Sequence, residues 1–294
     1  MTDTVEPTGR VEAAARQAGG TLLRRTGIVA IWLWVTFNVF LLAWMFISSL
    51  KTSGEIFSRE TALALPDTPQ WSNYVDAWAV QDFGLAFANT VTVVISAAIA
   101  VVVLSAPAAY VLSRTGVRTA NGMTTFIAVG MGIPLQAVLV PLFIMTNALG
   151  LADSLFGLGV VYVAVSMPFT VFLLTGFFRS LPGEIEEAAA LDGASGFRTF
   201  LGVMLPLARP GLVTALTLNI VLLWNETLLV LVLITDNQQY TLARSLLGLY
   251  SAMQYTGNWG GLFAGSVIVA APVLAIYFWL GRRIMEGMTM GIGK

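Results

Sequence analysis

The sequence predicts an all-α protein that crosses a membrane six times. Of its 294 residues, 57% are hydrophobic and 11% are charged, and the mean hydropathy is +0.81. A soluble chain typically carries about 25% charged residues, so this chain has too few to cover a water-facing surface of its size. The apolar residues also form long uncharged runs, and about 20 such residues span the ~30 Å hydrocarbon core of a bilayer.

The charged residues mark where each apolar helix begins and ends. The fifth apolar stretch contains a single ionisable residue, Glu226. The predicted helices cover residues 28–50, 88–112, 124–148, 155–179, 211–235 and 262–283. This division predicts three parts, namely an N-terminal tail (1–27), a six-span transmembrane domain (28–285) and a C-terminal tail (286–294).

The N-terminal tail is predicted to be disordered, because its first 20 residues are polar and charged and include Gly19-Gly20. It is not a cleavable signal, since the first apolar run is much longer than a signal-peptide core.

Lys and Arg residues set the predicted orientation. If the N-terminus faces the cytoplasm, the external loops hold only Lys51, Arg59 and Arg244, and the other basic residues fall in cytoplasmic segments. Cytoplasmic segments of membrane proteins are enriched in Lys and Arg, whereas acidic residues contribute little. Both ends are therefore predicted to be cytoplasmic, and residues 51–87 and 236–261 form the two long external segments.

The composition excludes most chemistry for this chain. It has no Cys and no His, so thiolate and imidazole metal sites and a Ser-His-Asp triad are absent. The net charge is −1 without a basic stripe, which argues against a nucleic-acid partner. A phosphate-binding P-loop requires Gly-Lys followed by Ser or Thr, and the only Gly-Lys pair is Gly293-Lys294 at the end of the chain. We therefore predict neither an enzyme nor a metal or cofactor site. A process that needs ATP would have to be powered by another subunit.

The cytoplasmic loop at residues 180–210, here called the bracket, is the most informative segment. Acidic residues near its start favour a helix N-terminus, and Gly193 is placed to end that helix in a left-handed conformation. Ser195 is predicted to cap a second, amphipathic helix, which Pro206 and Pro210 would end before the fifth span. Patterning alone allows an ordinary interfacial helix pair or a helix that inserts into a cleft on a partner protein.

The bracket resembles the coupling-loop motif of ABC importer permeases, in which Glu-Ala-Ala is followed by Gly and then by Ile and Leu-Pro. Here Val203 replaces the Ile, and the wider pattern resembles the carbohydrate-uptake branch of maltose-type and oligosaccharide-type permeases. The tail beginning at Glu286 is similar to that of the second permease of such pairs, although one residue shorter. Other matching pieces are Asn89-Thr90, Pro134 and Gln136, Trp224-Asn225-Glu226 and Asn258-Trp259. The motif residues of the bracket are Glu186, Glu187, Ala188, Ala189, Asp192, Gly193, Ala194, Leu205 and Pro206.

The resemblance implies a type I, six-helix ABC importer permease with cytoplasmic coupling helices, in the cell membrane of a prokaryote. It implies a second, homologous permease chain and an extracytoplasmic sugar-binding protein. It also implies two nucleotide-binding ATPase subunits, which would bind ATP and Mg and contact the bracket residues named above. The segment 236–261 resembles the loop that reaches the binding protein, with Tyr250, Tyr255 and Trp259 as candidate contacts. These aromatics could equally belong to an interfacial belt in contact with lipid.

Polar residues within the spans are the candidates for a translocation path. They are Gln136, Trp224, Asn225 and Glu226. A charge in a span costs on the order of 3 kcal/mol, so Glu226 is expected to face protein or water. Four roles for Glu226 are open. Its carboxylate could contact sugar hydroxyls, accept hydrogen bonds at a helix terminus, be protonated and neutral, or carry protons in a proton-coupled secondary transporter. An importer permease for glycerol phosphate, a peptide or another small polar solute is the other alternative.

Overall fold

The computed structural model describes residues 8–80, 82–114 and 117–290, and every regular element in these ranges is a helix. The last four residues of the predicted C-terminal tail and the first seven of the N-terminal tail lie outside the described residues. The elements are α1 (Thr8–Ser49), α2 (Ser53–Phe57), α3 (Ser72–Val80), α4 (Phe83–Arg114), α5 (Val117–Met131), α6 (Leu135–Ala148), α7 (Leu155–Ser180), α8 (Glu184–Leu191), α9 (Gly196–Thr199), the π-helix η1 (Phe200–Met204), α10 (Leu205–Leu207), α11 (Arg209–Trp224), α12 (Leu228–Leu233), the 3-10 helix η2 (Asn237–Gln239), α13 (Leu242–Thr256) and α14 (Trp259–Met290).

Four of the described helices are each long and apolar enough to cross a membrane, and two bent helix pairs bring the possible total to six. The four are α1, α4, α7 and α14, and the bent pairs are α5 with α6 and the α9–α10 segment with α11. The predicted class, an all-helical membrane protein, is thus confirmed.

Two of the predicted spans are not single helices. Residues 124–148 break before α6, and the two halves meet at 90°. Pro134 causes this break, because it has no N–H for the helix and drives the preceding residue, Ile133, toward extended backbone. The predicted span 211–235 breaks between Trp224 and Leu228, where the side chains of three polar residues compete for backbone hydrogen bonds.

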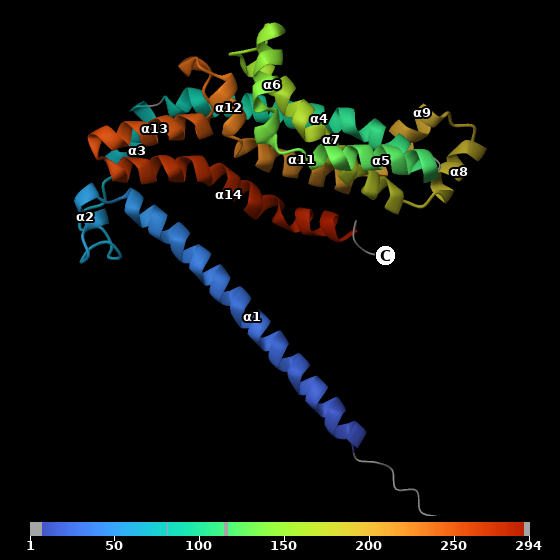
Figure 1. Cartoon of the computed structure of the whole chain (residues 1–294), viewed down its shortest axis with the longest axis horizontal. Helices are drawn as coiled ribbons and strands as arrows, with labels where there is room; N and C mark the ends of the chain where they lie inside the picture. The colour runs from blue at the N-terminus through green and yellow to red at the C-terminus, as the bar shows by residue number, and fades with distance from the viewer. Residues whose placement is uncertain (1–7, 81, 115–116, 291–294) are drawn as a thin grey trace, which may run out of the picture.

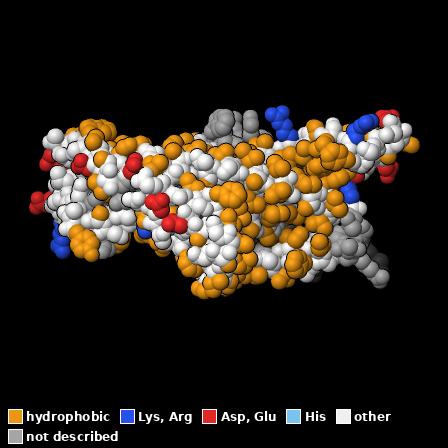
Figure 2. Space-filling view, turned by 90° about the horizontal axis from the view of Figure 1, so that it is seen from above, with side chains coloured by type: hydrophobic (Ala, Val, Ile, Leu, Met, Phe, Trp, Pro, Cys, Tyr) orange, Lys and Arg blue, Asp and Glu red, His pale blue; other side chains and the backbone are white. Residues whose placement is uncertain are grey.

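The helices form an elongated bundle (Figure 1). Helices α4, α5, α7, α11 and α14 follow its long axis, with α2, α3 and α13 at one end and α8 and α9 at the other. Figure 2 shows hydrophobic side chains across the middle of the visible face, with most of the charged side chains toward the two ends. The bracket and the two long external segments therefore lie at opposite ends of the molecule, as the predicted topology requires.

Helix α1 leaves the bundle at an angle (Figure 1) and is longer than predicted. It begins at Thr8, within the tail that was predicted to be disordered, and it has 42 residues. Its apolar side chains from Ile28 to Phe40 are exposed, including Trp32 and Trp34. Such a surface is stable only against lipid or another membrane protein.

Two hydrophobic cores divide the bundle along its length. The outer core contains Phe83, Tyr162, Leu229 and Leu249. The inner core joins the C-terminal half of α4 and the C-terminal half of α7 to the bracket, through the buried Leu174, Phe178, Phe200 and Met204. Because α4 and α7 contribute to both cores, they are the common frame on which the two ends of the molecule are built.

Candidate functional site

The first half of the bracket has the predicted helix and turn. Helix α8 begins with Glu184, Glu186 and Glu187 in its first turn, where the helix dipole favours anions. It ends at Gly193, whose φ is +78°, and the N–H of Ala194 donates to the Ala189 carbonyl at 3.0 Å. This is the left-handed turn that favours glycine.

The second half of the bracket differs from the prediction. Ser195 does cap it, accepting from the Arg198 N–H at 3.4 Å. The helix then passes from α9 through the π-helix η1 into α10, so Pro206 does not end it. Pro206 lies directly after η1, in the three-residue α10. The direction changes only at Ala208, where α11 leaves at 72°.

Two adjacent glutamates of the motif have different surroundings. The Glu186 carboxylate pairs with the guanidinium Nε of Arg114 at 2.6 Å, and Arg114 also donates to the Leu181 carbonyl at 3.3 Å. Glu187 is exposed to solvent. Glu186 therefore ties α8 to the end of α4, and Glu187 is the carboxylate available to a partner.

The outer surface of the bracket combines acidic and apolar groups. Leu191 is 90% exposed and Phe197 is 73% exposed. Of the remaining motif residues, Ala189, Ala194 and Leu205 are half-buried, whereas Ala188, Asp192, Gly193 and Pro206 are exposed. The bracket thus presents both acidic and large apolar side chains on its exposed surface.

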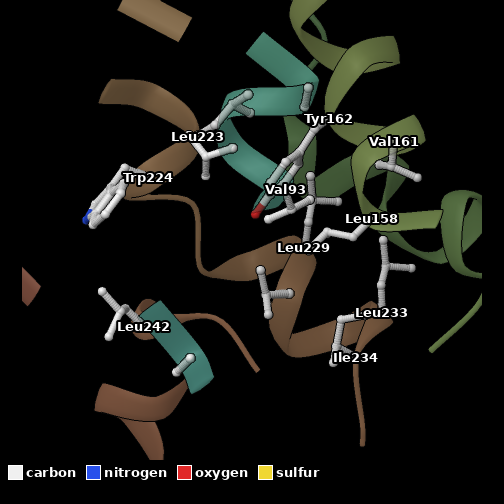
Figure 3. Close-up of a cluster of buried hydrophobic side chains, with 14 of the residues drawn as sticks. Val93, Leu158, Val161, Tyr162, Leu223, Trp224, Leu229, Leu233, Ile234 and Leu242 are labelled. Carbon is white, nitrogen blue, oxygen red and sulfur yellow. The ribbon is translucent and has the colours of Figure 1, made fainter. Parts of the chain in front are cut away.

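At the break in the fifth span, the Glu226 side chain caps the helix that follows, α12. Its carboxylate accepts the backbone N–H of Leu229 at 2.8 Å and of Val230 at 3.3 Å, which are the first free donors of α12. The Tyr162 hydroxyl of α7 donates to the same carboxylate at 3.2 Å. Figure 3 shows the Tyr162 ring within the cluster that also holds Leu229. Of the roles considered for Glu226, bonding of a helix terminus is the one seen here.

The other path candidates are placed differently from one another. Trp224 (labelled in Figure 3) is only 4% exposed. Its indole N–H donates to the Val269 carbonyl at 3.3 Å, and its ring lies 6.1 Å from the Phe87 ring. Asn225 and Gln136 are exposed. The structure thus brings Asn225 and Glu226 together at the break, and places Gln136 in α6, which packs on α12. Their part in a solute path stays a prediction.

The predicted external contacts lie around α13. Tyr255 is 92% exposed and Tyr250 is 43% exposed. Trp259 is half-buried. Its ring packs edge-on against the Phe57 ring at 5.5 Å, and its backbone N–H donates to the Ser53 hydroxyl at 3.0 Å. The two tyrosines are available to a partner, and Trp259 joins the start of α14 to α2.

A tightly bonded segment that the sequence did not reveal connects α12 to α13. We call residues 234–241 the outer strap. The Asp153 carboxylate accepts the backbone N–H groups of Thr235 at 2.8 Å and Asp236 at 2.9 Å, and also the Thr235 hydroxyl. These donors hold the pKa of Asp153 below its usual range. The φ of Asp153 is +54°, a position that Asp tolerates better than most residues.

Comparison with known proteins identifies the family. Residues 101–288 match the family described as binding-protein-dependent transport system inner membrane component. The chain belongs to this family. It is therefore a membrane-spanning permease subunit of an ABC importer, without catalytic activity of its own.

Individual relatives cover most of the chain. It is 38% identical over 259 residues to the diacetylchitobiose uptake system permease protein NgcG of Streptomyces coelicolor, covering 88% of this chain and 85% of the relative. It is 31% identical over 254 residues to the trehalose transport system permease protein SugB of Mycobacterium tuberculosis, covering 85% and 90%. A crystal structure of a bacterial ABC transporter involved in import of the acidic polysaccharide alginate contains a chain with the same fold, at 21% identity and a TM-score of 0.72, covering 96% and 99%.

Proposed function

We propose that this permease imports a sugar or a short oligosaccharide, delivered by an extracytoplasmic binding protein and driven by two ATPase subunits. Relatives named for diacetylchitobiose and trehalose uptake support the substrate class. Apart from Arg179, Arg282 and Arg283 at the ends of two predicted spans, the predicted spans contain no basic side chain that would favour an anionic solute. The proposal includes a second, homologous permease chain and cytoplasmic N- and C-termini.

The bracket is the observation that carries the proposed coupling. Its exposed Glu187 stands in a rigid helix that ends on the left-handed Gly193, beside the exposed Leu191 and Phe197. A short helix with a free carboxylate and two apolar side chains fits a cleft that offers a basic group and an apolar wall. In the proposed complex, the two ATPase subunits bind ATP and Mg, and α8 sits in a cleft of one of them. Movement of that subunit would shift α8 and the spans attached to it.

The proposed external contact is α13. Tyr250 and Tyr255 are exposed there, and tyrosine gives a large contact area with a polar tip. Because α13 lies at the opposite end of the bundle from α8 (Figure 1), one end would face the binding protein and the other the ATPase subunits.

Reconstituted uptake tests this function. The affinity-purified complex is placed in liposomes with ATP inside, and labelled diacetylchitobiose or trehalose is added outside with the co-encoded binding protein. We expect uptake that requires both ATP and the binding protein, and none of glycerol 3-phosphate under the same conditions. Uptake by the chain alone without ATP would refute the proposal and favour a secondary transporter.

A further inference from the structure

Helix α4 connects the two ends of the molecule. It has 32 residues, and a helix of this length extends about 48 Å at 1.5 Å per residue. In Figure 1 it runs from the end that carries α13 to the end that carries α8. Side chains at both of its ends bond to those two regions.

The outer end of α4 is hydrogen-bonded to the outer strap and to the start of α13. The Asn89 side-chain amide donates to the backbone carbonyls of Gln238 at 2.8 Å and Tyr240 at 3.1 Å. The Thr90 hydroxyl accepts the N–H of Leu242, the first residue of α13, at 2.8 Å. Asn89 is 8% exposed and Thr90 is 1% exposed. The bond between Thr90 and Leu242 is buried, so breaking it leaves a buried polar group without a partner. These bonds hold the start of α13 to α4.

The inner end of α4 is bonded to the bracket. Arg114 holds the Glu186 carboxylate of α8 at 2.6 Å, as described above. One turn earlier, the Tyr110 ring lies 5.0 Å from the Phe200 ring of η1 and 5.6 Å from the Phe178 ring of α7. An ion pair and an aromatic cluster thus fix α4 to both halves of the bracket.

Between these ends, α4 is packed closely along α7. Its buried face carries small residues at the contact, including Ala97, Ala98 and Ala109. Small side chains let two helices approach closely in a membrane. Close-packed elements transmit displacement rather than absorb it, so a displacement at the outer end of α4 is expected to reach its inner end.

We propose that α4 transmits docking of the binding protein on α13 to the ATPase subunits at α8, with Thr90 and Arg114 as the positioning residues that fix its two ends. This inference rests on the proposed function, because it assumes those partners. In thermodynamic terms, the two bonded ends would provide the coupling free energy between two distant sites. Without the Thr90–Leu242 bond or the Arg114–Glu186 ion pair, α13 and α8 would still form their contact surfaces. Docking on α13 would then no longer change the ATPase rate.

The test compares ATPase activity of the complete complex in lipid nanodiscs, with and without sugar-loaded binding protein. The readout is the ratio of stimulated to basal rate, since a merely structural defect lowers both rates together. Thr90→Val removes only the hydroxyl that holds Leu242. Thr92→Val is the matched control, because the Thr92 hydroxyl donates only within its own helix, to the Ala88 carbonyl at 2.8 Å. We expect Thr90→Val to lower the ratio about fivefold or more and Thr92→Val to leave it unchanged.

The second arm breaks the inner bond with Arg114→Gln, alone and together with Thr90→Val. If both residues act along one helix, either change interrupts the same route, and the double variant is no worse than the single variants. Losses that multiply, or a normal ratio in Thr90→Val, would overturn the proposal. If the unaltered complex shows no stimulation at all, the proposed function fails instead. Should Arg114→Gln prevent assembly, the Thr90 and Thr92 pair still decides the outcome.

Discussion

Replacing Glu226 by Ala gives the sharpest test of what this residue does. The change removes the cap on the Leu229 and Val230 N–H groups and the partner of the Tyr162 hydroxyl. Loss of a helix cap costs about 0.5–2 kcal/mol, and loss of one further hydrogen bond costs about 1 kcal/mol. We therefore expect a total of about 2 kcal/mol. At 2–4 °C per kcal/mol for large chains, this lowers the melting temperature by about 4–8 °C.

Two further variants separate the contributions at the same place. Glu226→Gln keeps one carbonyl oxygen for the Leu229 N–H, so we expect about half the loss. Tyr162→Phe keeps both backbone bonds of Glu226 and should cost about 1 kcal/mol or less. Thermal unfolding of the purified complex in detergent, followed by intrinsic fluorescence, ranks the variants by melting temperature. If Glu226→Ala melted like the unaltered complex but lost uptake, the capping argument would be refuted and a direct role in the path favoured.

Three other predictions follow from the site. Glu187→Arg should abolish sugar-dependent ATPase activity while the chain still inserts into the membrane. Glu184→Arg changes an exposed charge in the same helical turn and should leave that activity intact; equal effects of the two variants would point to the helix dipole instead. Gly193→Ala should destabilise the bracket by about 1 kcal/mol, because its φ is +78°, and should reduce recovery of the ATPase subunits on affinity purification. Because the folded pKa of Asp153 is lowered, its stabilisation of the strap is present above the ordinary Asp pKa of about 3.9 and is lost as pH falls through the lower folded pKa. Hydrogen exchange at Thr235 and Asp236 should therefore show lost protection only in acid, and Asp153→Asn should show it at neutral pH.

The fold class was predictable because composition and apolar runs respond directly to the membrane. The same reasoning did not predict that two of the spans break into separate helices, since hydropathy reports how apolar a segment is and not where its backbone changes direction. Pro134 and the polar residues at 225–227 were visible in the sequence, but a proline or a polar residue within a span is often tolerated without a break. Whether the chain turns there depends on tertiary contacts, such as the bond from Tyr162 to Glu226.

Site prediction succeeded where the signal is local. The turn at Gly193 and the cap at Ser195 depend on a few neighbouring residues, and both are present. The roles of Arg114, Asp153 and Tyr162 depend on partners far away in sequence, the nearest of them more than 60 residues distant. No spacing rule identifies such pairs. The separation of Glu186 from Glu187 into an internal ion pair and a free carboxylate likewise required the position of α4.

The two breaks differ in a way that bears on assembly. The break at 225–227 is satisfied within the chain, because Glu226 bonds the free donors of α12. The break at 132–134 is exposed, and α6 stands out from the bundle with Val140 and Ile144 uncovered (Figure 1). Non-helical backbone at membrane depth is stable only when protein covers it or when it lines a water-filled cavity. Lipid alone is therefore a poor neighbour for this break. The second permease chain proposed above would cover the break or line a water-filled path with it, and would so complete a surface that this chain alone leaves unsuited to the bilayer.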